Sequence, residues 1–463
     1  MYRIPRILIS AGASGSGKTL FTLGLLSALK MRGKNVASFK CGPDYIDPMF
    51  HEEVVGKRSV NLDSFFVGEE EVKSRLWEHS KDCDIAIIEG VMGYYDGLAG
   101  ISPRASAYDL AKITKTPTVL LVDAKGASLS LLAYIKGFLS YKENSFIGGV
   151  IFNRISPMLY PRMKGLVEKE LGIPVLGYLK ENPKFTIKSR HLGLVLPEEI
   201  SDLQEKIRLV GEEIEKTVDV NQILAMANQS PKFTIREDEI YKAKKKQAVS
   251  IGVAKDEAFC FLYKDNLALL EKMGANLVYF SPLRDESLPK NLDGLLLPGG
   301  YPELYAKTLS DNKAMLLSVQ EAIESGMPCI AECGGFLYLH EQILDKEGNA
   351  YSMVGVVAGT SYFTGKLSRF GYVTLKGQNI FGSELGEIPA HEFHYYESEN
   401  CGDAMWAQKP LSDRGWKCCH SKESLFAGFP HLYFYGNPKL AEKFYDTCIK
   451  YQEKKGKVYG DPA

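Results

Sequence analysis

The sequence lacks the features of a secreted, membrane-spanning or nucleic-acid-binding protein. No apolar run in its 463 residues approaches the roughly 18–20 residues that a transmembrane helix needs, and the first segment resembles a strand more than a signal peptide. Its nine cysteines have no C-x-x-C spacing, so we expect neither a disulfide framework nor a zinc site, and a reducing, cytoplasmic compartment. A formal net charge of −1 gives no electrostatic reason to expect nucleic acid or a membrane as partner.

What the sequence does contain is two successive α/β patterns. In the first half, apolar strands alternate with helical patterns such as 20–30 and 158–171, which predicts a doubly wound parallel sheet. The polar stretch from Gln229 to Gln247 interrupts the pattern, and a new α/β pattern begins with "AVSIGVAKD". We therefore predict an α/β protein of two domains, 1–240 and 248–463. The strands expected in the first domain are 6–11, 36–40, 84–90, 118–123, 146–153 and 173–179.

The segment "SAGASGSGKT" lies between the first expected strand and the first expected helix. Its spacing is G-x-x-x-x-G-K-T, with Gly12, Gly15 and Gly17 allowing the backbone N–H groups to converge on one anion. The positive end of the following helix faces the same anion. Lys18 is expected to reach the outer phosphates of ATP and Thr19 to hold Mg²⁺.

A second candidate site is "AECGGFLYL", which places Cys333 and Gly334 between an apolar strand and an apolar helix. This pattern is typical of a nucleophile elbow, a sharp turn that lifts a reactive side chain above the sheet. The helix N-terminus is expected to lower the pKa of the thiol. The N–H of Gly334 is expected to serve as one oxyanion donor, and the flexible pair Gly299 and Gly300, in "LPGGYPE", to supply the other, so all three glycines are expected to bind the substrate.

A cysteine nucleophile needs a base, and three histidines are candidates. We favour His431, in "FPHLYFYGNP", over His391 and His394, in "PAHEFHYYES". The last two are three residues apart, so on a strand they face opposite sides and are not expected to share a metal. A Cys–His pair indicates acyl transfer without identifying the substrate.

Six motifs in order along the chain, "GASGSGKT", "FKCGPDYIDPMFH", "IIEGVMGYYDG", "LPGGYPE", "AECGGFLYL" and "HEFHY", resemble those of the cobyrinic acid a,c-diamide synthase family. The resemblance implies a dethiobiotin-synthetase-like P-loop domain followed by a class I glutamine amidotransferase domain. It also implies that Cys333 is the glutaminase nucleophile and that His431 raises its nucleophilicity. Many class I glutaminases have a glutamate two residues after that histidine; here Tyr433 occupies the position, so the resemblance implies a Cys–His pair without a third member.

Four carboxylates are expected at the phosphate site, because ligands bind at the carboxyl ends of strands in a doubly wound sheet. Asp44 and Asp47 are placed in a turn after the second strand, and Glu89 and Asp96 at and beyond the end of the next. We expect Asp47 and Glu89 to hold Mg²⁺, and Asp44, Asp47 and Asp96 to bind the substrate, a division that the sequence leaves open. Tyr45 is expected to pack against a flat macrocycle.

By the same resemblance, Asn153 contacts the adenine, and the implied reaction is ATP- and glutamine-dependent amidation of the a and c carboxylates of cobyrinate through acyl phosphates, in anaerobic cobalamin biosynthesis. The expected ligands are cobyrinate, L-glutamine, ATP and Mg²⁺. A homodimer is compatible with the sequence, which does not determine the oligomeric state.

Hydrogenobyrinate and nickel-sirohydrochlorin stay open as alternative substrates. An alternative of another class is a P-loop ATPase switch with a non-catalytic C-terminal module. Such ATPases carry an extra lysine just after the first glycine of the loop, where this chain has Ala13.

Overall fold

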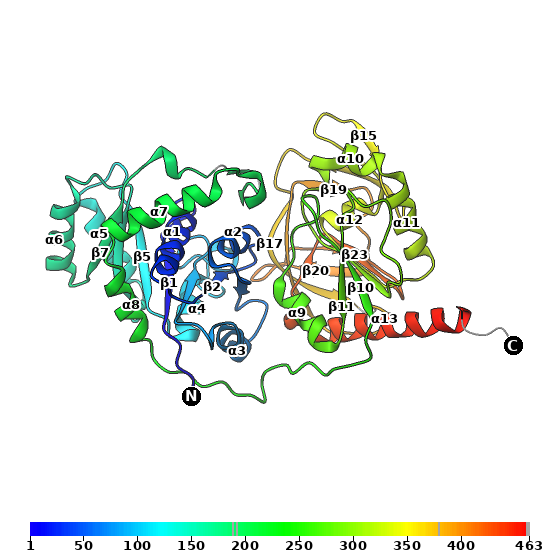
Figure 1. Ribbon diagram of the computed structural model, residues 1–463, viewed down its shortest axis with the longest axis horizontal. Coiled ribbons are helices and arrows are strands. Elements are labelled where there is room, and N and C mark those ends of the chain that lie inside the picture. Colours follow the sequence, from blue (N-terminus) through cyan, green and yellow to red (C-terminus); the bar gives the residue numbers. More distant parts are fainter. Residues whose placement is uncertain (188, 191–192, 378–379, 460–463) are drawn as a thin grey trace. The chain divides into compact units, whose positions relative to one another are not determined.

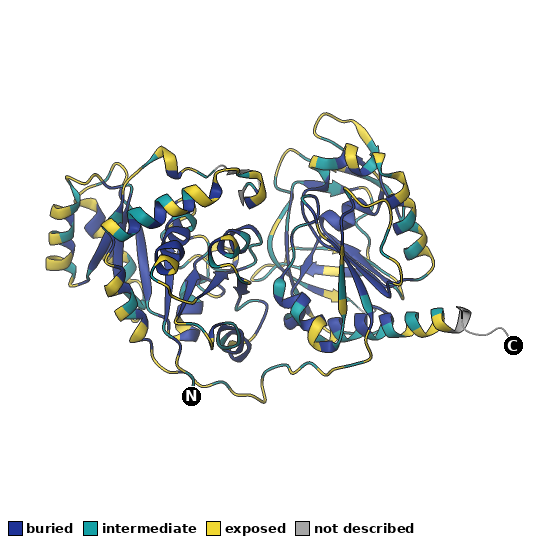
Figure 2. Ribbon diagram, viewed as in Figure 1, coloured by how far each residue is buried: buried dark blue, intermediate teal, exposed yellow. Residues whose placement is uncertain are grey.

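The computed structural model describes residues 1–187, 189–190, 193–377 and 380–459 (Figure 1). The chain divides into two compact units, Met1–Ile240 and Tyr241–Ala463. Each unit is built around a largely parallel sheet. The strands of this sheet are buried, and the helices that accompany it expose one face to solvent (Figure 2).

The first unit contains a seven-stranded sheet in the order β3-β2-β4-β1-β5-β6-β7, and all of its neighbouring strands are parallel. Its strands are β1 (Arg6–Ala11), β2 (Val36–Cys41), β3 (Val60–Leu62), β4 (Ile85–Glu89), β5 (Thr118–Asp123), β6 (Ile147–Asn153) and β7 (Val175–Leu179), with a small pair β8 (Ser189–Arg190) and β9 (Gly193–Leu194) outside the sheet. Its helices are α1 (Lys18–Met31), α2 (Ile46–Val55), α3 (Glu69–Ser80), α4 (Ala107–Thr114), α5 (Ser130–Ser140), α6 (Tyr160–Leu171), α7 (Leu203–Thr217) and α8 (Val220–Asn228).

The predicted doubly wound sheet is confirmed, and its order explains where the site forms. The chain adds β2, β3 and β4 on one side of β1, and then β5, β6 and β7 on the other. The phosphate loop therefore follows the strand at which the winding reverses, the place where such sheets bind ligands. Strand β3 was not predicted, because three residues are too short for a recognisable pattern.

The second unit contains a six-stranded sheet in the order β11-β10-β12-β13-β23-β22, which is parallel except for its last pair. Four- and five-stranded sheets accompany it, in the orders β15-β14-β16-β19 and β21-β20-β17-β18-β24. The strands are β10 (Ser250–Ala254), β11 (Asn276–Phe280), β12 (Gly294–Leu297), β13 (Cys329–Glu332), β14 (His340–Leu344), β15 (Ala350–Ser352), β16 (Val357–Phe363), β17 (Arg369–Gly377), β18 (Ile388–His394), β19 (Tyr396–Ser398), β20 (Met405–Gln408), β21 (Gly415–Cys418), β22 (His420–Ser421), β23 (Leu425–Gly428) and β24 (His431–Leu432). The helices are α9 (Lys264–Met273), α10 (Ala306–Asp311), α11 (Lys313–Glu324), α12 (Gly334–Tyr338) and α13 (Pro438–Tyr459).

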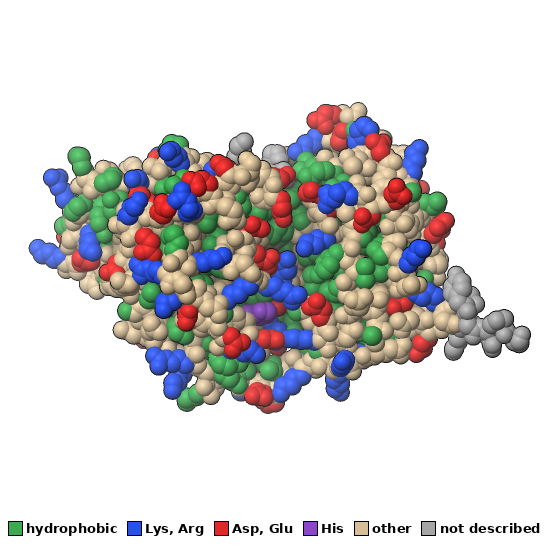
Figure 3. Space-filling model, viewed as in Figure 1, with side chains coloured by type: hydrophobic (Ala, Val, Ile, Leu, Met, Phe, Trp, Pro, Cys, Tyr) green, Lys and Arg blue, Asp and Glu red, His purple; other side chains and the backbone are tan. Residues whose placement is uncertain are grey.

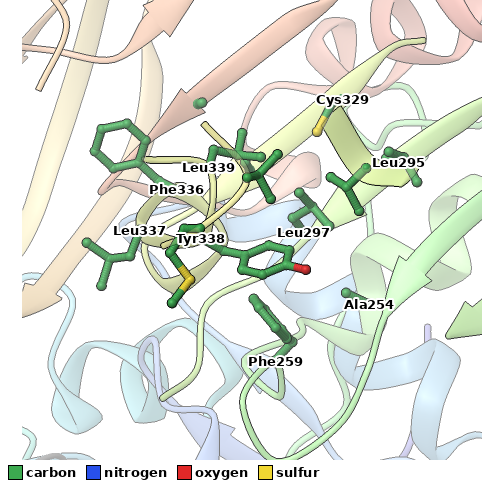
Figure 4. Close-up of a cluster of buried hydrophobic side chains, with 14 of the residues drawn as sticks. Ala254, Phe259, Leu295, Leu297, Cys329, Phe336, Leu337, Tyr338 and Leu339 are labelled. Atoms are coloured by element: carbon green, nitrogen blue, oxygen red, sulfur yellow. The ribbon is translucent and has the colours of Figure 1, made fainter. Parts of the chain in front are cut away.

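A buried apolar cluster supports the short helix α12 (Figure 4). Phe336 and Tyr338 are fully buried, and the Tyr338 ring meets Phe259 edge-on with the centroids 5.2 Å apart. Leu295 and Leu297 of β12 belong to the same cluster. Because tightly packed interiors permit little movement, this cluster holds the turn before α12 in one position.

Charged side chains of both signs are interspersed on the face shown in Figure 3, in keeping with the net charge of −1. Within the described part of the chain, no helix combines the length and apolar character needed to cross a bilayer.

Candidate functional sites

The loop between β1 and α1 has the conformation of a phosphate-binding loop. Gly17 adopts a left-handed conformation with φ of 90° directly before α1, and a Cβ there would lie 2.3 Å from Nδ2 of Asn153, so only glycine fits. Lys18 is buried, and its ammonium donates to the carbonyl oxygens of Ala13 at 2.9 Å and Met92 at 2.6 Å. Burial lowers the pKa of Lys18 to about 8.

Gly12 and Gly15 lie in the same loop, and Asn153 contacts it from the end of β6. Gly15 is also left-handed, with φ of 74°, and a Cβ on Gly12 would collide with the Tyr134 hydroxyl. The side chain of Asn153 donates from Nδ2 to the carbonyl oxygen of Ser16 at 2.8 Å. Asn153 therefore braces the loop in this structure, a role separate from the adenine contact that the resemblance implies.

Five side chains converge at the start of α1. The Thr19 hydroxyl donates to Glu89 Oε1 at 2.7 Å and lies 3.2 Å from Asp47 Oδ2. The Lys40 ammonium donates to Asp47 Oδ2 at 2.5 Å and Glu89 Oε1 at 2.9 Å, and His51 Nε2 lies 2.7 Å from Glu89 Oε2. The cluster is almost wholly buried, so these charges interact in a medium of low polarity.

The electrostatics of this cluster separate its two carboxylates. Burial opposes charge on Glu89, but the neighbouring Lys40 and His51 outweigh it and hold the pKa of Glu89 below its ordinary value. Burial and the nearby Asp44 raise the pKa of Asp47. Although burial disfavours its charge, Lys40 keeps a pKa well above the ordinary value because Asp47 and Glu89 surround it.

Sequence reasoning did not identify Lys40 or His51 as site residues. The available signal was Lys40 itself, a charged residue in the otherwise apolar strand segment "VASFKC", which is buried along its length. His51 lies inside α2, and its contact with Glu89 joins positions 38 residues apart, so no local pattern marks it.

The oxygen ligands present fit Mg²⁺, which prefers hydroxyl, carboxylate and phosphate oxygens. Thr19, Asp47 and Glu89 would hold the ion. Among the described residues, no group of three or more His, Cys, Asp or Glu side chains is arranged to hold a metal. Phosphate and water oxygens would therefore complete the coordination.

The predicted position of Asp47, in a turn after the second strand, was wrong. Asp47 lies in the first turn of α2 and not in a loop, because Asp44 Oδ1 accepts the N–H groups of Ile46 at 2.9 Å and Asp47 at 3.0 Å and so starts the helix there. Tyr45 immediately precedes α2 and is half-buried.

Asp96 is exposed, and its Oδ2 accepts the N–H of Gly93 at 3.0 Å. A Cβ on Gly93 would lie 2.6 Å from the carbonyl oxygen of Gly12, so the loop that contains Asp96 lies beside the phosphate loop.

In the second unit, Cys333 occupies the turn between β13 and α12 with φ of 46° and ψ of −100°, a strained conformation for a residue with a Cβ. A Cβ on Gly335 would lie 1.9 Å from the carbonyl oxygen of Leu297, and one on Gly334 would lie 2.9 Å from the Gly300 nitrogen. The turn therefore has the predicted elbow geometry, and the Gly299–Gly300 loop packs directly against it.

The expected lowering of the Cys333 pKa was wrong for the protein without substrate. Burial raises the pKa of the thiol, and the carboxylates of Glu303, Glu392 and Glu332 add to the rise. The following helix α12 has only five residues, so its dipole does not compensate for the loss of water around the sulfur. A base is therefore needed to remove the proton.

His431 lies in β24, next to the loop that packs on the elbow. A Cβ on Gly299 would lie 2.5 Å from Cε1 of His431, so the imidazole and Gly334 approach the same pair of glycines. The Nδ1 atom of His431 is 3.5 Å from Oε2 of Glu332, the residue before Cys333. The structure therefore brings Cys333, His431 and the glycine loop together.

The two other candidate histidines occupy different positions. His391 is the cross-strand neighbour of His431, and its pKa lies well below the ordinary value because of burial and the adjacent His431. His394 is stacked on Phe429 with the centroids 3.9 Å apart, and its Nδ1 lies 2.6 Å from the carbonyl oxygen of Tyr396. His394 is thus held in the interior, and His391 is the one that lies beside the candidate base.

Comparison with known families finds one matching domain in each half of the chain. Residues 7–195 match the nucleotide-binding domain described as CobQ/CobB/MinD/ParA, and residues 250–439 match the CobB/CobQ-like glutamine amidotransferase domain. A nucleotide-binding P-loop domain joined to a glutaminase domain defines a glutamine-dependent ligase that forms amides.

Three relatives identify the family within this class. The chain is 40% identical over 455 residues to a cobyrinate a,c-diamide synthase of Caldanaerobacter subterraneus, covering 97% of this chain and all of the relative. It is 42% identical to the enzyme of that name from Clostridium acetobutylicum and 39% identical to that from Listeria innocua, covering 93% and 94% of this chain and 97% of each relative. The chain belongs to the cobyrinate a,c-diamide synthase family.

Proposed function

We propose that this protein amidates the a and c carboxylates of cobyrinate in anaerobic cobalamin biosynthesis, with ATP and glutamine as co-substrates. The observation that carries the proposal is the similarity to named cobyrinate a,c-diamide synthases over nearly the whole chain, together with both sites on it. Its nine cysteines are free thiols, which supports a cytoplasmic location.

The first unit activates the carboxylate. A carboxylate is a poor electrophile because oxide is a bad leaving group, and transfer of the γ-phosphoryl group of ATP converts it into an acyl phosphate. Lys18 and the loop N–H groups hold the phosphates, and the Lys40 ammonium adds a buried positive charge beside them. Bound Mg²⁺ supplies further neutralisation of the phosphate charge. Ammonia then attacks the acyl carbon, and phosphate leaves.

The second unit supplies the ammonia. The Cys333 sulfur attacks the side-chain amide carbon of glutamine while His431 takes the thiol proton. His431 returns that proton to the leaving nitrogen as the C–N bond breaks, which releases ammonia. Water then hydrolyses the glutamyl thioester to glutamate and restores the thiol.

Two alternatives within the family differ only in the macrocycle, hydrogenobyrinate or nickel-sirohydrochlorin. The ATPase-switch alternative is disfavoured by Ala13, which stands where such ATPases carry lysine, and by a C-terminal unit that retains the elbow beside a histidine.

The deciding experiment incubates the purified protein with ATP, Mg²⁺, glutamine and each tetrapyrrole separately, with product mass as the readout. We expect cobyrinate to lose about 1 mass unit for each carboxylate converted to an amide, twice. Diamidation of another macrocycle with a larger kcat/KM would transfer the proposal to that substrate, and ATP hydrolysis without amidation of any of them would overturn it.

A further inference from the structure

The segment around His431 has no glutamate two residues after the histidine, but a carboxylate from another segment lies beside the imidazole. We propose that Glu332, the residue directly before the nucleophile, is the positioning residue of His431. This inference rests on the proposed function, because it takes Cys333 as nucleophile and His431 as base.

The contact is on the correct nitrogen of the imidazole. Glu332 Oε2 lies 3.5 Å from Nδ1 of His431, and both side chains are buried. A hydrogen on Nδ1 shared with the carboxylate leaves Nε2 with the lone pair that must accept the thiol proton. The separation is long for a hydrogen bond, as is common before substrate binds, and it shortens when the imidazolium forms.

A second contact holds the carboxylate in place. Oε1 of Glu332 accepts the N–H of Leu432, the residue after His431, at 3.3 Å. One carboxylate thus contacts both the imidazole and the adjoining backbone of β24. Glu332 is buried, so few water molecules compete with these two contacts.

The position used in other class I glutaminases cannot perform this role here. Tyr433, two residues after His431, donates its hydroxyl to Asp265 Oδ2 at 2.7 Å. Its side chain is therefore committed to a separate buried contact with α9. The carboxylate partner of His431 therefore comes from Glu332, at the end of β13 directly before the nucleophile, and not from the segment that follows the histidine.

The other groups facing His431 do not replace that charge. His391, its cross-strand neighbour, is driven toward the neutral form by burial, and Phe261 presents an aromatic ring with its centroid 6.3 Å away. Deleting the Glu332 charge therefore removes the carboxylate that faces Nδ1 of His431.

The test measures the steady-state kinetics of glutamine hydrolysis for Glu332→Gln, which retains an acceptor for Leu432 but loses the charge. We expect kcat to fall roughly 10- to 1,000-fold, less than the about 10⁴-fold loss for the equivalent change in a serine-protease triad, with KM for glutamine changed less than about threefold. The readout is the contrast between kcat and KM, because a carboxylate that only orients His431 does not bind glutamine. A purely structural role would instead destabilise the unit and change KM together with kcat.

The matched control is Asp265→Asn, which neutralises another buried carboxylate of the same unit, one that contacts Tyr433, and should leave kcat for glutamine hydrolysis close to the unmodified value. If Glu332→Gln does not fold, Glu332→Asp decides, since the shortened carboxylate retreats from Nδ1 and kcat should still fall. Normal kcat in the folded variant would overturn the positioning role. If Cys333→Ser also hydrolysed glutamine normally, the proposed glutaminase site itself would be wrong.

Discussion

Two buried lysines beside the phosphate loop differ in what surrounds their ammonium groups. Lys18 donates to two backbone carbonyls, and burial lowers its pKa to about 8. Lys40 lies between two carboxylates that hold its pKa well above the ordinary value. Lys18 is therefore the group with most to gain from an arriving phosphate, because its present partners carry no full charge.

Replacing Lys18 by alanine should reduce amide synthesis by at least about 10²-fold with either glutamine or ammonium as nitrogen source, because the phosphates lose a preorganised positive charge. Glutamine hydrolysis by the second unit should persist. The measurement is product formation with each nitrogen source; near-normal ammonium-dependent synthesis would contradict the nucleotide site.

The carboxylates of the first unit can be ranked by their contacts. Glu89→Gln and Asp47→Asn remove charges that Lys40 and Thr19 contact, and each should lower kcat for synthesis by about 10- to 1,000-fold. Asp44→Asn and Asp96→Asn retain backbone acceptors and should impair synthesis less. Synthesis rates at several Mg²⁺ concentrations test this; unchanged kcat and Mg²⁺ dependence in all four variants would mean that these carboxylates are not part of the site.

At the scale of elements, the parts that could be predicted are those encoded by neighbouring residues. Apolar strands, the loop ending in Lys18 and the glycines after Cys333 are local patterns, and they appear where expected. Other contacts join segments that are far apart in the sequence and meet only in the folded sheet, so no single segment reveals them. They are the contacts of Lys40 and His51 with Glu89 and of Glu332 with His431. The predicted position of Asp47 was wrong because the Asp44 side chain starts helix α2 just before it. The predicted direction of the Cys333 pKa shift was wrong because burial of the thiol outweighs the effect of the short helix.

The elbow depends on a close approach between two elements. Gly335→Ala would place a Cβ 1.9 Å from the Leu297 carbonyl oxygen, so β12 and α12 must separate. We expect destabilisation by about 1–3 kcal/mol, measured by denaturant unfolding, and a loss of glutaminase activity. Gly137→Ala is the control, because its Cβ meets nothing within 4 Å and lies inside a helix, where alanine is favoured. Equal stability of the two variants would contradict the tight elbow.

The strand β14, which follows α12, contains a buried histidine whose titration should make the free energy of unfolding depend on pH. His340 is fully buried, its ring nitrogens lie 2.8 Å from the Phe336 carbonyl oxygen and 2.6 Å from Ser398 Oγ, and burial lowers its pKa to about 4. The unfolded chain takes up its proton near pH 6.5, so folding stability should be lost as the pH falls from about 6.5 to 4, by roughly 3 kcal/mol at most.

The check is chemical denaturation at several pH values, compared with His340→Gln, which cannot titrate. The difference in unfolding free energy between the two proteins should change over that interval. Parallel pH profiles would contradict a neutral buried His340.

In the proposed function, each of the two units of the molecule carries out one half-reaction. The first unit holds the phosphate loop and its buried carboxylates, and the second holds the elbow, the glycine loop and His431. Neither site shares a side chain with the other, so damage to one should leave the chemistry of the other intact.

The most direct test is the Cys333→Ser variant assayed for amide synthesis with glutamine and, separately, with concentrated ammonium at raised pH, where more of it is ammonia. We expect this variant to lose glutamine-dependent synthesis and to retain ATP-dependent synthesis from ammonium at close to the unmodified rate. His431→Ala should show the same pattern with some residual glutamine-dependent activity. Loss of the ammonium-supported reaction in a folded Cys333→Ser protein would contradict the account, because the cysteine would then take part in synthesis itself.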